Sequence, residues 1–264
     1  MGSTSQMIDW DVGRYEQMAL ELGPVAAHVV SLADVQRGER VVDLATGTGN
    51  AALLAARAGG LVTGVDTAPR LIDVARGRAV AEAVDASFVV ADMHGLPFDD
   101  ASFDVALSVF GLIFAADASR AFDEMIRVLR PAGRALFSAW VPAGPIGAMT
   151  ATFGRALVAA TGRRPPRFAW HDPDAVGGLA ARHRADVQIH DGQLRITAPS
   201  PEAYLEANEQ QHPVSVAGRP ALERAGTYGR VRDEALRILR EGNEDPQAFC
   251  VSSPYRVIEV HRSG

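Results

Sequence analysis

The chain has 264 residues, of which 47% are hydrophobic, so it is long enough to bury a full core as one large domain or as one domain with an insertion. Its net charge of −6 does not supply the positive surface that binding to a nucleic-acid backbone requires, so we expect no nucleic-acid partner. All 26 basic residues are arginine, and the absence of lysine excludes Schiff-base chemistry and a phosphate-binding P-loop lysine.

Signals for export, membrane insertion and metal binding are absent from the sequence. Cys250 is the only cysteine, so neither an intrachain disulfide nor a cysteine-rich zinc site can form. No apolar run approaches the roughly 20 residues that cross a bilayer, and the first residues lack the basic and apolar regions of a signal peptide. We therefore expect a cytoplasmic protein with no metal and no membrane insertion, and homo-oligomerisation stays open.

The first half of the chain predicts an α/β fold. Residues 11–35 indicate one or two helices, and from Arg40 onward short β-rich runs alternate with longer helical segments. Right-handed crossovers between such strands produce a Rossmann-like, doubly wound and mostly parallel sheet with helices on both faces. The expected strands are 41–44, 61–65, 87–91, 105–109 and 135–140, and the expected helices are 50–58, 70–83 and 118–129.

The alternation ends after Trp140, which predicts a helical cap inserted in the C-terminal half. The segment 185–198 indicates a strand pair or one long strand, and 249–261 indicates a closing strand. Further helices are expected over 146–161, 202–211 and 220–241. We therefore divide the chain into a cofactor-binding core (1–140), a cap or substrate region with late strands of the sheet (141–248) and a closing strand (249–264).

A glycine-rich loop, residues 45–49, joins the first expected strand to the next helix. Glycines there let the backbone turn sharply and approach a ligand at the carboxyl edge of the sheet. The spacing Gly47-x-Gly49-x-x-Ala52 also matches a loose dinucleotide fingerprint. However, Asp43 would repel the pyrophosphate of a dinucleotide, whereas it would attract the ammonium and sulfonium groups of S-adenosylmethionine. An alternative role for Asp43 is to cap the next helix or to brace the loop.

Acidic residues follow three successive strands. Asp43 and Asp66 end the first and second strands, and Asp92 follows the third apolar run. Because the carboxyl ends of parallel strands meet at one edge of a sheet, we expect these carboxylates to lie near the glycine loop. Asp66 can accept both hydroxyls of a ribose, and Asp92 can accept a hydrogen bond from an adenine amino group. The ordered set favours S-adenosylmethionine over a nicotinamide cofactor.

Two further segments complete the set of motifs: 96–105, Leu-Pro-Phe-Asp-Asp-Ala-Ser-Phe-Asp-Val, and 124–134, Glu-Met-Ile-Arg-Val-Leu-Arg-Pro-Ala-Gly-Arg. With residues 43–49, Asp66 and Asp92, they resemble the class I S-adenosylmethionine-dependent methyltransferases of the ubiquinone/menaquinone methyltransferase-like group. The resemblance covers about residues 15–140. It departs at Ala132, where the family usually has a second glycine. These motifs do not define the acceptor.

The resemblance implies S-adenosylmethionine as cofactor and S-adenosylhomocysteine as product. It places the methionine moiety against the glycine loop, with Asp43 toward the amino group and the backbone around Phe110 near the methionine tail. Asp66 and Thr67 would then hold the ribose. The cofactor-binding residues expected from this likeness are Tyr15, Asp43, Ala45, Thr46, Gly47, Gly49, Asp66, Thr67, Asp92, Met93 and Phe110.

Aromatic residues near the carboxyl edge indicate the acceptor pocket. Phe114, Trp140 and Trp170 are expected to line it, because small-molecule pockets are mainly apolar with a few polar groups. We therefore expect a small aromatic or apolar acceptor from specialised or quinone-like metabolism, methylated on oxygen, nitrogen or carbon. Arginines 163, 164 and 167 leave an acidic acceptor open.

Methyl transfer from a sulfonium is an in-line displacement, which needs no metal but can need a base for the acceptor. His171, next to Asp172, is the candidate catalytic base. The alternative, that it bonds the backbone or caps the next helix, is the commoner role of a loop histidine. His94 is expected to be exposed to solvent near a helix start.

Two other functions stay open. A noncatalytic or regulatory protein could keep the S-adenosylmethionine pocket without transferring a methyl group. An NAD-dependent oxidoreductase could use a similar fold, but the absence of lysine removes the Tyr-x-x-x-Lys pair of short-chain reductases. A base-methylating enzyme is disfavoured, because Ser108-Val-Phe-Gly111 follows the fourth strand in place of an Asn/Asp-Pro-Pro-aromatic loop.

Overall fold

The computed structural model describes Trp10, residues 15–164 and residues 168–263. The strands are β1 (Arg40–Leu44), β2 (Leu61–Asp66), β3 (Ala86–Val90), β4 (Phe103–Val109), β5 (Leu129–Trp140), β6 (Ala185–Ala198) and β7 (Phe249–Arg262). The helices are α1 (Tyr15–Glu21), α2 (Gly23–Ala33), α3 (Asn50–Arg57), α4 (Pro69–Ala81), the 3-10 turn η1 (Leu112–Phe114), α5 (Ala118–Val128), α6 (Gly144–Thr161), α7 (Pro173–Ala181), α8 (Pro201–Gln211), α9 (Pro213–Arg224) and α10 (Tyr228–Glu241).

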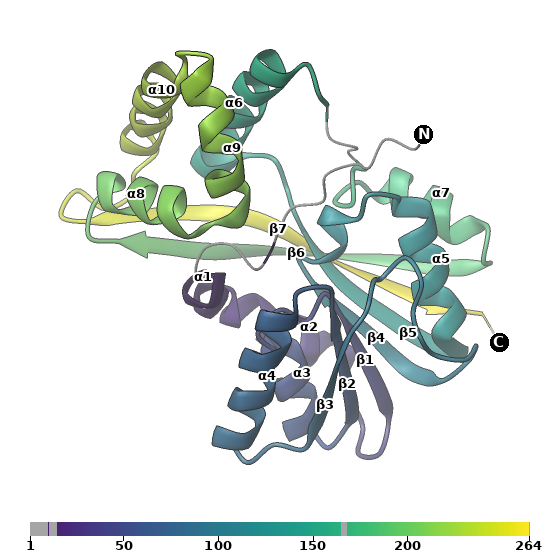
Figure 1. Cartoon of the computed structure of the whole chain (residues 1–264). Coiled ribbons are helices and arrows are strands. Elements are labelled where there is room, and N and C mark those ends of the chain that lie inside the picture. The colour runs from purple at the N-terminus through teal and green to yellow at the C-terminus, as the bar shows by residue number, and fades with distance from the viewer. Residues whose placement is uncertain (1–9, 11–14, 165–167, 264) are drawn as a thin grey trace. The chain divides into compact units, whose positions relative to one another are not determined.

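Within the described residues, the strands form a seven-stranded sheet in the order β3-β2-β1-β4-β5-β7-β6 (Figure 1). Strands β1 to β5 are parallel, and β7 runs antiparallel to β5. The strand order reverses between β1 and β4, which places a topological switch point at their carboxyl ends. The Rossmann-like, mostly parallel sheet that the sequence predicts is therefore confirmed.

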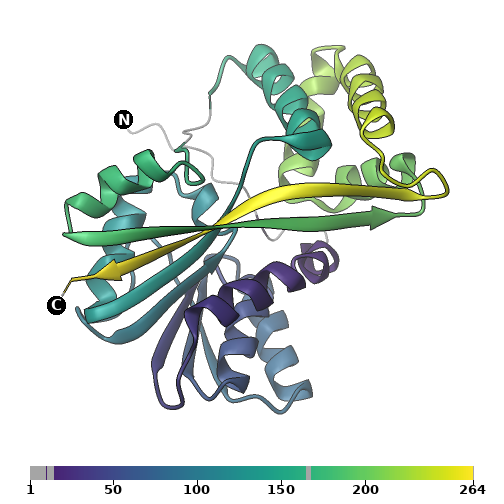
Figure 2. The ribbon, with the colours of Figure 1, turned by 180° about the vertical axis from the view of Figure 1, so that it is seen from behind.

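Helices cover both faces of the parallel part of the sheet. On one face α2 packs on β4 and β5, α3 on β1, and α4 on β2 and β3, as Figure 1 and the reverse view in Figure 2 show. The buried residues Val25, Ala26 and Val29 give α2 an apolar stripe at helical spacing. Helices α5 and α7 cover the opposite face, which completes the doubly wound arrangement.

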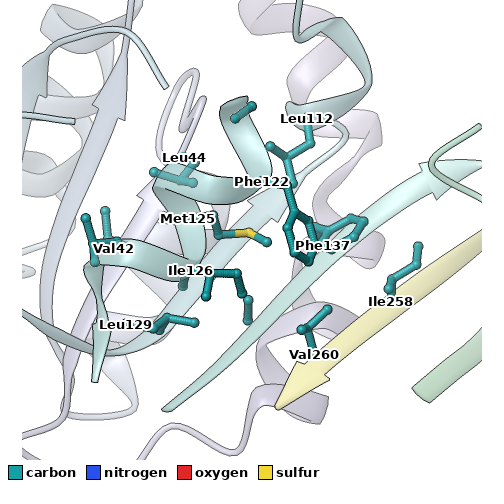
Figure 3. Close-up of a cluster of buried hydrophobic side chains, with 14 of the residues drawn as sticks. Val42, Leu44, Leu112, Phe122, Met125, Ile126, Leu129, Phe137, Ile258 and Val260 are labelled. Carbon is teal, nitrogen blue, oxygen red and sulfur yellow. The ribbon is translucent and has the colours of Figure 1, made fainter. Parts of the chain in front are cut away.

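The main hydrophobic core lies between the sheet and α5 (Figure 3). Phe122, Met125 and Ile126 of α5 are buried at spacings of three and four, and they pack toward Phe137 of β5. The antiparallel strand β7 adds Ile258 to the same cluster. Burial of such side chains contributes about 1.5–3 kcal/mol each, so this cluster anchors the parallel strands whose ends carry the functional loops.

The chain forms two compact units. One contains residues 19–141, 166–194 and 254–264, and it includes the parallel part of the sheet. The other contains residues 1–18, 142–165 and 195–253. In this second unit α6 packs against α9 and α10. The buried Glu209 of α8 accepts hydrogen bonds from the Tyr228 hydroxyl at 2.7 Å and from the Arg232 guanidinium at 3.2 Å. These two donors from α10 offset the desolvation of the carboxylate.

The segment 185–198 forms one strand, which is one of the two arrangements that the sequence left open. Other elements differ from the prediction. The helix expected over 220–241 is broken at 225–227, where Gly226 has a φ of +64°. Helix α7 (173–181) lies outside the helices that the sequence predicts. Residues 11–14 of the first expected helix and Arg167 lie outside the described residues. Of the helices that the structure describes, none is long and apolar enough to cross a membrane.

The core predicts the effect of a cavity on stability. Phe122→Ala should lower the free energy of unfolding by about 3–5 kcal/mol, because the space left by the ring is only partly refilled. Urea unfolding followed by tryptophan fluorescence measures it, since Trp170 belongs to the same cluster. Val80→Ala on α4 is the control, because Val80 is 82% exposed and should change stability by no more than about 0.5 kcal/mol. Equal losses in the two variants would contradict this account of the core.

Candidate functional site

The glycine loop between β1 and α3 has three residues in the left-handed region of backbone space. The φ angles are +52° for Ala45, +54° for Gly47 and +85° for Gly49. Glycine adopts such angles freely, but at Ala45 they cost about 1–2 kcal/mol. A hydrogen bond attaches the loop to the sheet: the Thr46 amide donates to the carbonyl of Val65 in β2, at 2.9 Å. Its tight path brings the backbone amides of α3's first turn to the carboxyl edge of the sheet.

Asp43 lies beneath this loop and is buried, with 2% of its surface exposed. Its Oδ2 atom accepts a hydrogen bond from the Thr46 hydroxyl at 2.6 Å and from the Ala52 amide at 3.1 Å. The structure therefore shows the bracing role that the sequence left open beside a cofactor role. Burial raises the pKa of Asp43 to about 7, against the lowering effect of these two hydrogen bonds.

Asp66 ends β2 and holds the loop from the other side. Its Oδ2 atom accepts from the Gly47 amide at 2.8 Å, and its Oδ1 atom accepts from the Ala68 amide at 2.9 Å. The carboxylate therefore joins the glycine loop to the turn that starts α4. The three acids have different partners: Asp43 and Asp66 accept hydrogen bonds from the glycine loop, whereas Asp92 accepts from His94.

Asp92 forms a pair with His94 beyond the end of β3. Its Oδ1 atom accepts from the His94 amide at 2.9 Å and lies 2.6 Å from Nδ1 of the same imidazole. Partial burial would raise the pKa of Asp92, but the bonds from His94 bring it below its ordinary value. Nε2 of His94 accepts from the Asp117 amide at 3.2 Å, and only 16% of the side chain is exposed. The expected solvent exposure of His94 is therefore wrong, because both ring nitrogens bind the protein.

Phe110 forms a strained corner at the carboxyl end of β4. Its φ is +55°, and its amide donates to the Ser138 hydroxyl at 3.0 Å. Gly111 is required beside it, because a β-carbon there would lie 2.5 Å from the β-carbon of Ala45. The ring of Phe110 stacks on Trp140, with centroids 3.9 Å apart and an interplanar angle of 6°. The corner therefore joins the glycine loop to an aromatic pair.

The other expected cofactor residues lie in three different settings. Thr67 is exposed directly after Asp66, and Met93 is half-buried against the main core. Tyr15 belongs to the second compact unit, where its ring meets Trp10 edge to face at 5.5 Å. The structure therefore places every expected cofactor residue except Tyr15 in the unit that contains the parallel strands.

The aromatic residues expected to line an acceptor pocket do not form one group. Trp140 is half-buried on Phe110, and Phe114 is 38% exposed. Trp170 is only 2% exposed, and its ring packs edge to face on Phe137 and Phe168, at 5.4 and 4.8 Å. This corrects the expectation for Trp170, because a side chain enclosed in the main core has almost no surface to offer a small molecule.

His171 and Asp172 form the turn before α7. Asp172 caps that helix, since its Oδ1 atom accepts from the Asp174 amide at 2.9 Å. The carbonyl of His171 accepts from the Arg256 guanidinium at 2.8 Å. The local bonds therefore give Asp172 a structural task, and the role of His171 as a base stays a prediction.

Two polar residues beside the aromatic corner were not expected from the sequence. The hydroxyl oxygen of Tyr255, in β7, lies 2.8 Å from Nδ1 of His28, in α2. The ring of Tyr255 meets the ring of Phe110 edge to face, with centroids 6.1 Å apart. No motif marks either residue: His28 lies within an apolar helix, and Tyr255 lies in an alternating strand. Only their distance in space, across 227 positions of sequence, brings them together.

Known proteins resemble this chain in sequence and in fold. Residues 42–137 match the model of a methyltransferase domain. The chain is 34% identical over 188 residues to an uncharacterized protein of Mycobacterium tuberculosis, which is 71% of this chain and 69% of that protein. It is 44% identical over 107 residues to the demethylmenaquinone methyltransferase of Thermus thermophilus, covering 40% of this chain and 49% of that enzyme. The YcgJ protein from Bacillus subtilis has the same fold, with a TM-score of 0.62 over 90% of this chain and 98% of that one, at 18% identity.

The braced glycine loop lies at the switch point of a mostly parallel sheet, within the residues that match the methyltransferase domain. With the matching domain model and the relatives above, the chain belongs to the S-adenosylmethionine-dependent methyltransferase family.

The buried carboxylate predicts a specific dependence of stability on pH. The folded state holds a proton on Asp43 up to about pH 7, whereas the unfolded state loses it near the ordinary value of 3.8, so ionisation opposes folding as pH rises between the two. Asp43→Asn should therefore gain stability relative to the native protein by about 1.4 kcal/mol per pH unit over this range. The gain should become constant above pH 7, where Asp43 is ionised in both states.

Urea unfolding of the ligand-free protein at several pH values measures this difference. Subtracting the free energy of unfolding of the native protein from that of Asp43→Asn cancels the titration of all other groups. A difference that does not change with pH would refute the effect of burial on Asp43.

Proposed function

We propose that this protein transfers the methyl group of S-adenosylmethionine to an oxygen, nitrogen or carbon atom of a small aromatic or apolar molecule. The observation that carries the proposal is the glycine loop held in a left-handed path by Asp43 and Asp66 at the switch point between β1 and β4. Ligands of doubly wound folds bind at that crevice. When bound, the cofactor supplies a methyl carbon on a positively charged sulfur.

The charge of the site fits such a cofactor. Asp43 and Asp66 lie at the ends of neighbouring strands, and a buried carboxylate with a raised pKa gains most from a cationic ligand. A pyrophosphate at the same place would face both carboxylates and be repelled. We assign Asp43 to the amino group of the methionine moiety, and Asp66 with Thr67 to the ribose.

The remaining cofactor contacts are assigned to the residues that follow β3 and β4. Asp92, with Met93 beside it, is assigned to the adenine, because an ionised carboxylate accepts hydrogen bonds from an amino group. The backbone around Phe110, fixed by Ser138, is assigned to the methionine tail. These residues orient the cofactor and exclude water, which are the main tasks of the protein in an in-line displacement.

The acceptor side is aromatic. Trp140 stacks on Phe110, and Phe114 offers exposed apolar surface after β4. Such surfaces favour planar or apolar ligands. The demethylmenaquinone methyltransferase relative supports a quinone-like acceptor through the 107 residues that it shares with this chain.

Cofactor binding tests the first part of the proposal. Asp66→Asn should weaken binding of S-adenosylhomocysteine by about 1–3 kcal/mol, because hydrogen bonds to a charged group are lost. Isothermal titration calorimetry measures the affinity. Asp73→Asn on α4 is the matched control, since its side chain is 74% exposed and pairs with Arg76 of the same helix. An unchanged affinity in Asp66→Asn would defeat the assignment.

A screen tests the reaction itself. Phenols, quinols, amines and coenzyme A thioesters should be offered with methyl-labelled S-adenosylmethionine, and we expect label transfer to an aromatic or apolar member of the panel. NAD should not bind in the same calorimetric assay. Binding of S-adenosylhomocysteine without transfer to any acceptor would favour a noncatalytic role, and turnover of only polyanionic or macromolecular acceptors would refute the acceptor class.

A further inference from the structure

His28 and Tyr255 form a polar pair, an imidazole and a phenol, and neither residue is assigned to the cofactor. Nδ1 of His28 and the hydroxyl of Tyr255 are 2.8 Å apart, a hydrogen-bond distance. His28 is half-buried, and the structure shows no hydrogen bond from its second ring nitrogen, Nε2, to a described residue. An imidazole held through one nitrogen can use the other to exchange a proton.

The pair lies at the carboxyl edge of the sheet. Tyr255 is the register partner of Trp140, the last residue of β5, and its ring meets Phe110 edge to face. Phe110 stacks on Trp140, and the adjoining Gly111 contacts the glycine loop at Ala45. An unbroken series of contacts within one compact unit therefore joins His28 to the loop assigned to the cofactor.

The backbone of β6 makes room for Tyr255. A β-carbon on Gly192 would lie 2.7 Å from the Tyr255 hydroxyl oxygen, so a larger residue there would displace the ring. Burial raises the pKa of Tyr255, which keeps the phenol uncharged. Tyr255 is therefore a fixed, neutral partner for the imidazole.

We propose that His28, oriented by Tyr255, is the catalytic base that accepts the proton of a phenol or quinol hydroxyl during methyl transfer. This proposal rests on the proposed function and names the acceptor class of the same site. Nδ1 of His28 carries a hydrogen and donates it to the Tyr255 oxygen, which leaves the lone pair of Nε2 to accept a proton. Tyr255 is a positioning residue, because it acts through His28.

The step balances without a further reactant. The hydroxyl proton of the acceptor moves to Nε2 of His28, and the freed oxygen pair forms a bond to the methyl carbon. The carbon–sulfur bond breaks as that bond forms, and its electron pair stays on sulfur, so the positive charge of the sulfonium passes to the imidazolium. The half-buried ring of Trp140, held in place by its stack on the buried Phe110, suits the ring of such an acceptor.

The tautomer of His28 tests the proposal without an acceptor. Nitrogen NMR of histidine-labelled protein, alone and with S-adenosylhomocysteine, distinguishes the two neutral forms, and the His28→Gln variant assigns the signal. We expect hydrogen on Nδ1, and we expect this preference to be lost in Tyr255→Phe, which keeps the ring contacts and removes the hydroxyl. Hydrogen on Nε2 in the native protein would overturn the proposal, because that nitrogen could not accept a proton.

Kinetics with a phenol or quinol found in the screen supplies the second readout. His28→Gln should lower kcat by about 100-fold or more, the scale of general base catalysis, with little change in KM or in affinity for S-adenosylhomocysteine. Tyr255→Phe should show a smaller loss of the same kind. His261→Gln is the matched control, because the ring of that histidine lies 2.7 Å from Glu259 and its register partner is Arg134, at the other end of the part of β5 that pairs with β7.

The outcomes separate the two proposals. If native protein fails to bind S-adenosylhomocysteine, the proposed function fails. If it binds and His28→Gln keeps the native kcat, or if His171→Gln alone loses it, the role of His28 is wrong while the proposed function stands.

Discussion

The glycine loop depends on hydrogen bonds to two carboxylates. Asp43 receives the Thr46 hydroxyl and the Ala52 amide, and Asp66 receives the Gly47 and Ala68 amides. A loop with three left-handed residues has many alternative paths of similar energy, so these bonds select one of them. The shape of the cofactor site therefore follows from acidic side chains below the loop, and the parallel strands place those side chains there.

This arrangement sets stability against function at Asp43. Burial of the carboxylate disfavours its ionised form, and the Thr46 and Ala52 bonds only partly compensate. A cationic ligand nearby would favour the ionised form, so binding would offset the cost that burial places on ionising Asp43. Phe110 shows the same principle in the backbone, because its left-handed conformation persists under the bond from Ser138 and the stack on Trp140.

Each compact unit contains its own buried polar centre. In the unit with the parallel strands, the centre is the pair of loop carboxylates, whose donors are mostly backbone amides. In the other unit it is Glu209, whose donors are the side chains of Tyr228 and Arg232. A side-chain donor is lost when its residue is substituted, whereas a backbone amide donor is present whichever residue carries it and depends only on the backbone conformation. The loop site is therefore the more tightly specified of the two.

The sequence by itself determined the parallel strands, the glycine loop and the acids at the strand ends. Hydrophobic periodicity and turn residues act locally, and parallel crossovers then bring the carboxyl ends of successive strands to one edge whatever the details of packing. Asp43 and Asp66 could be placed from this rule alone, even though their bracing bonds could not.

Only the tertiary structure decided which aromatic and histidine side chains lie at that edge. Trp170 is enclosed in the core, His94 is held between Asp92 and the amide of Asp117, and His28 meets Tyr255 across 227 positions. Such contacts depend on side-chain packing between elements far apart in the chain, and a single residue's type carries no record of them. Both tryptophans were therefore predicted to line an apolar pocket, but Trp170 lies in the core and Trp140 lies at the carboxyl edge of the sheet.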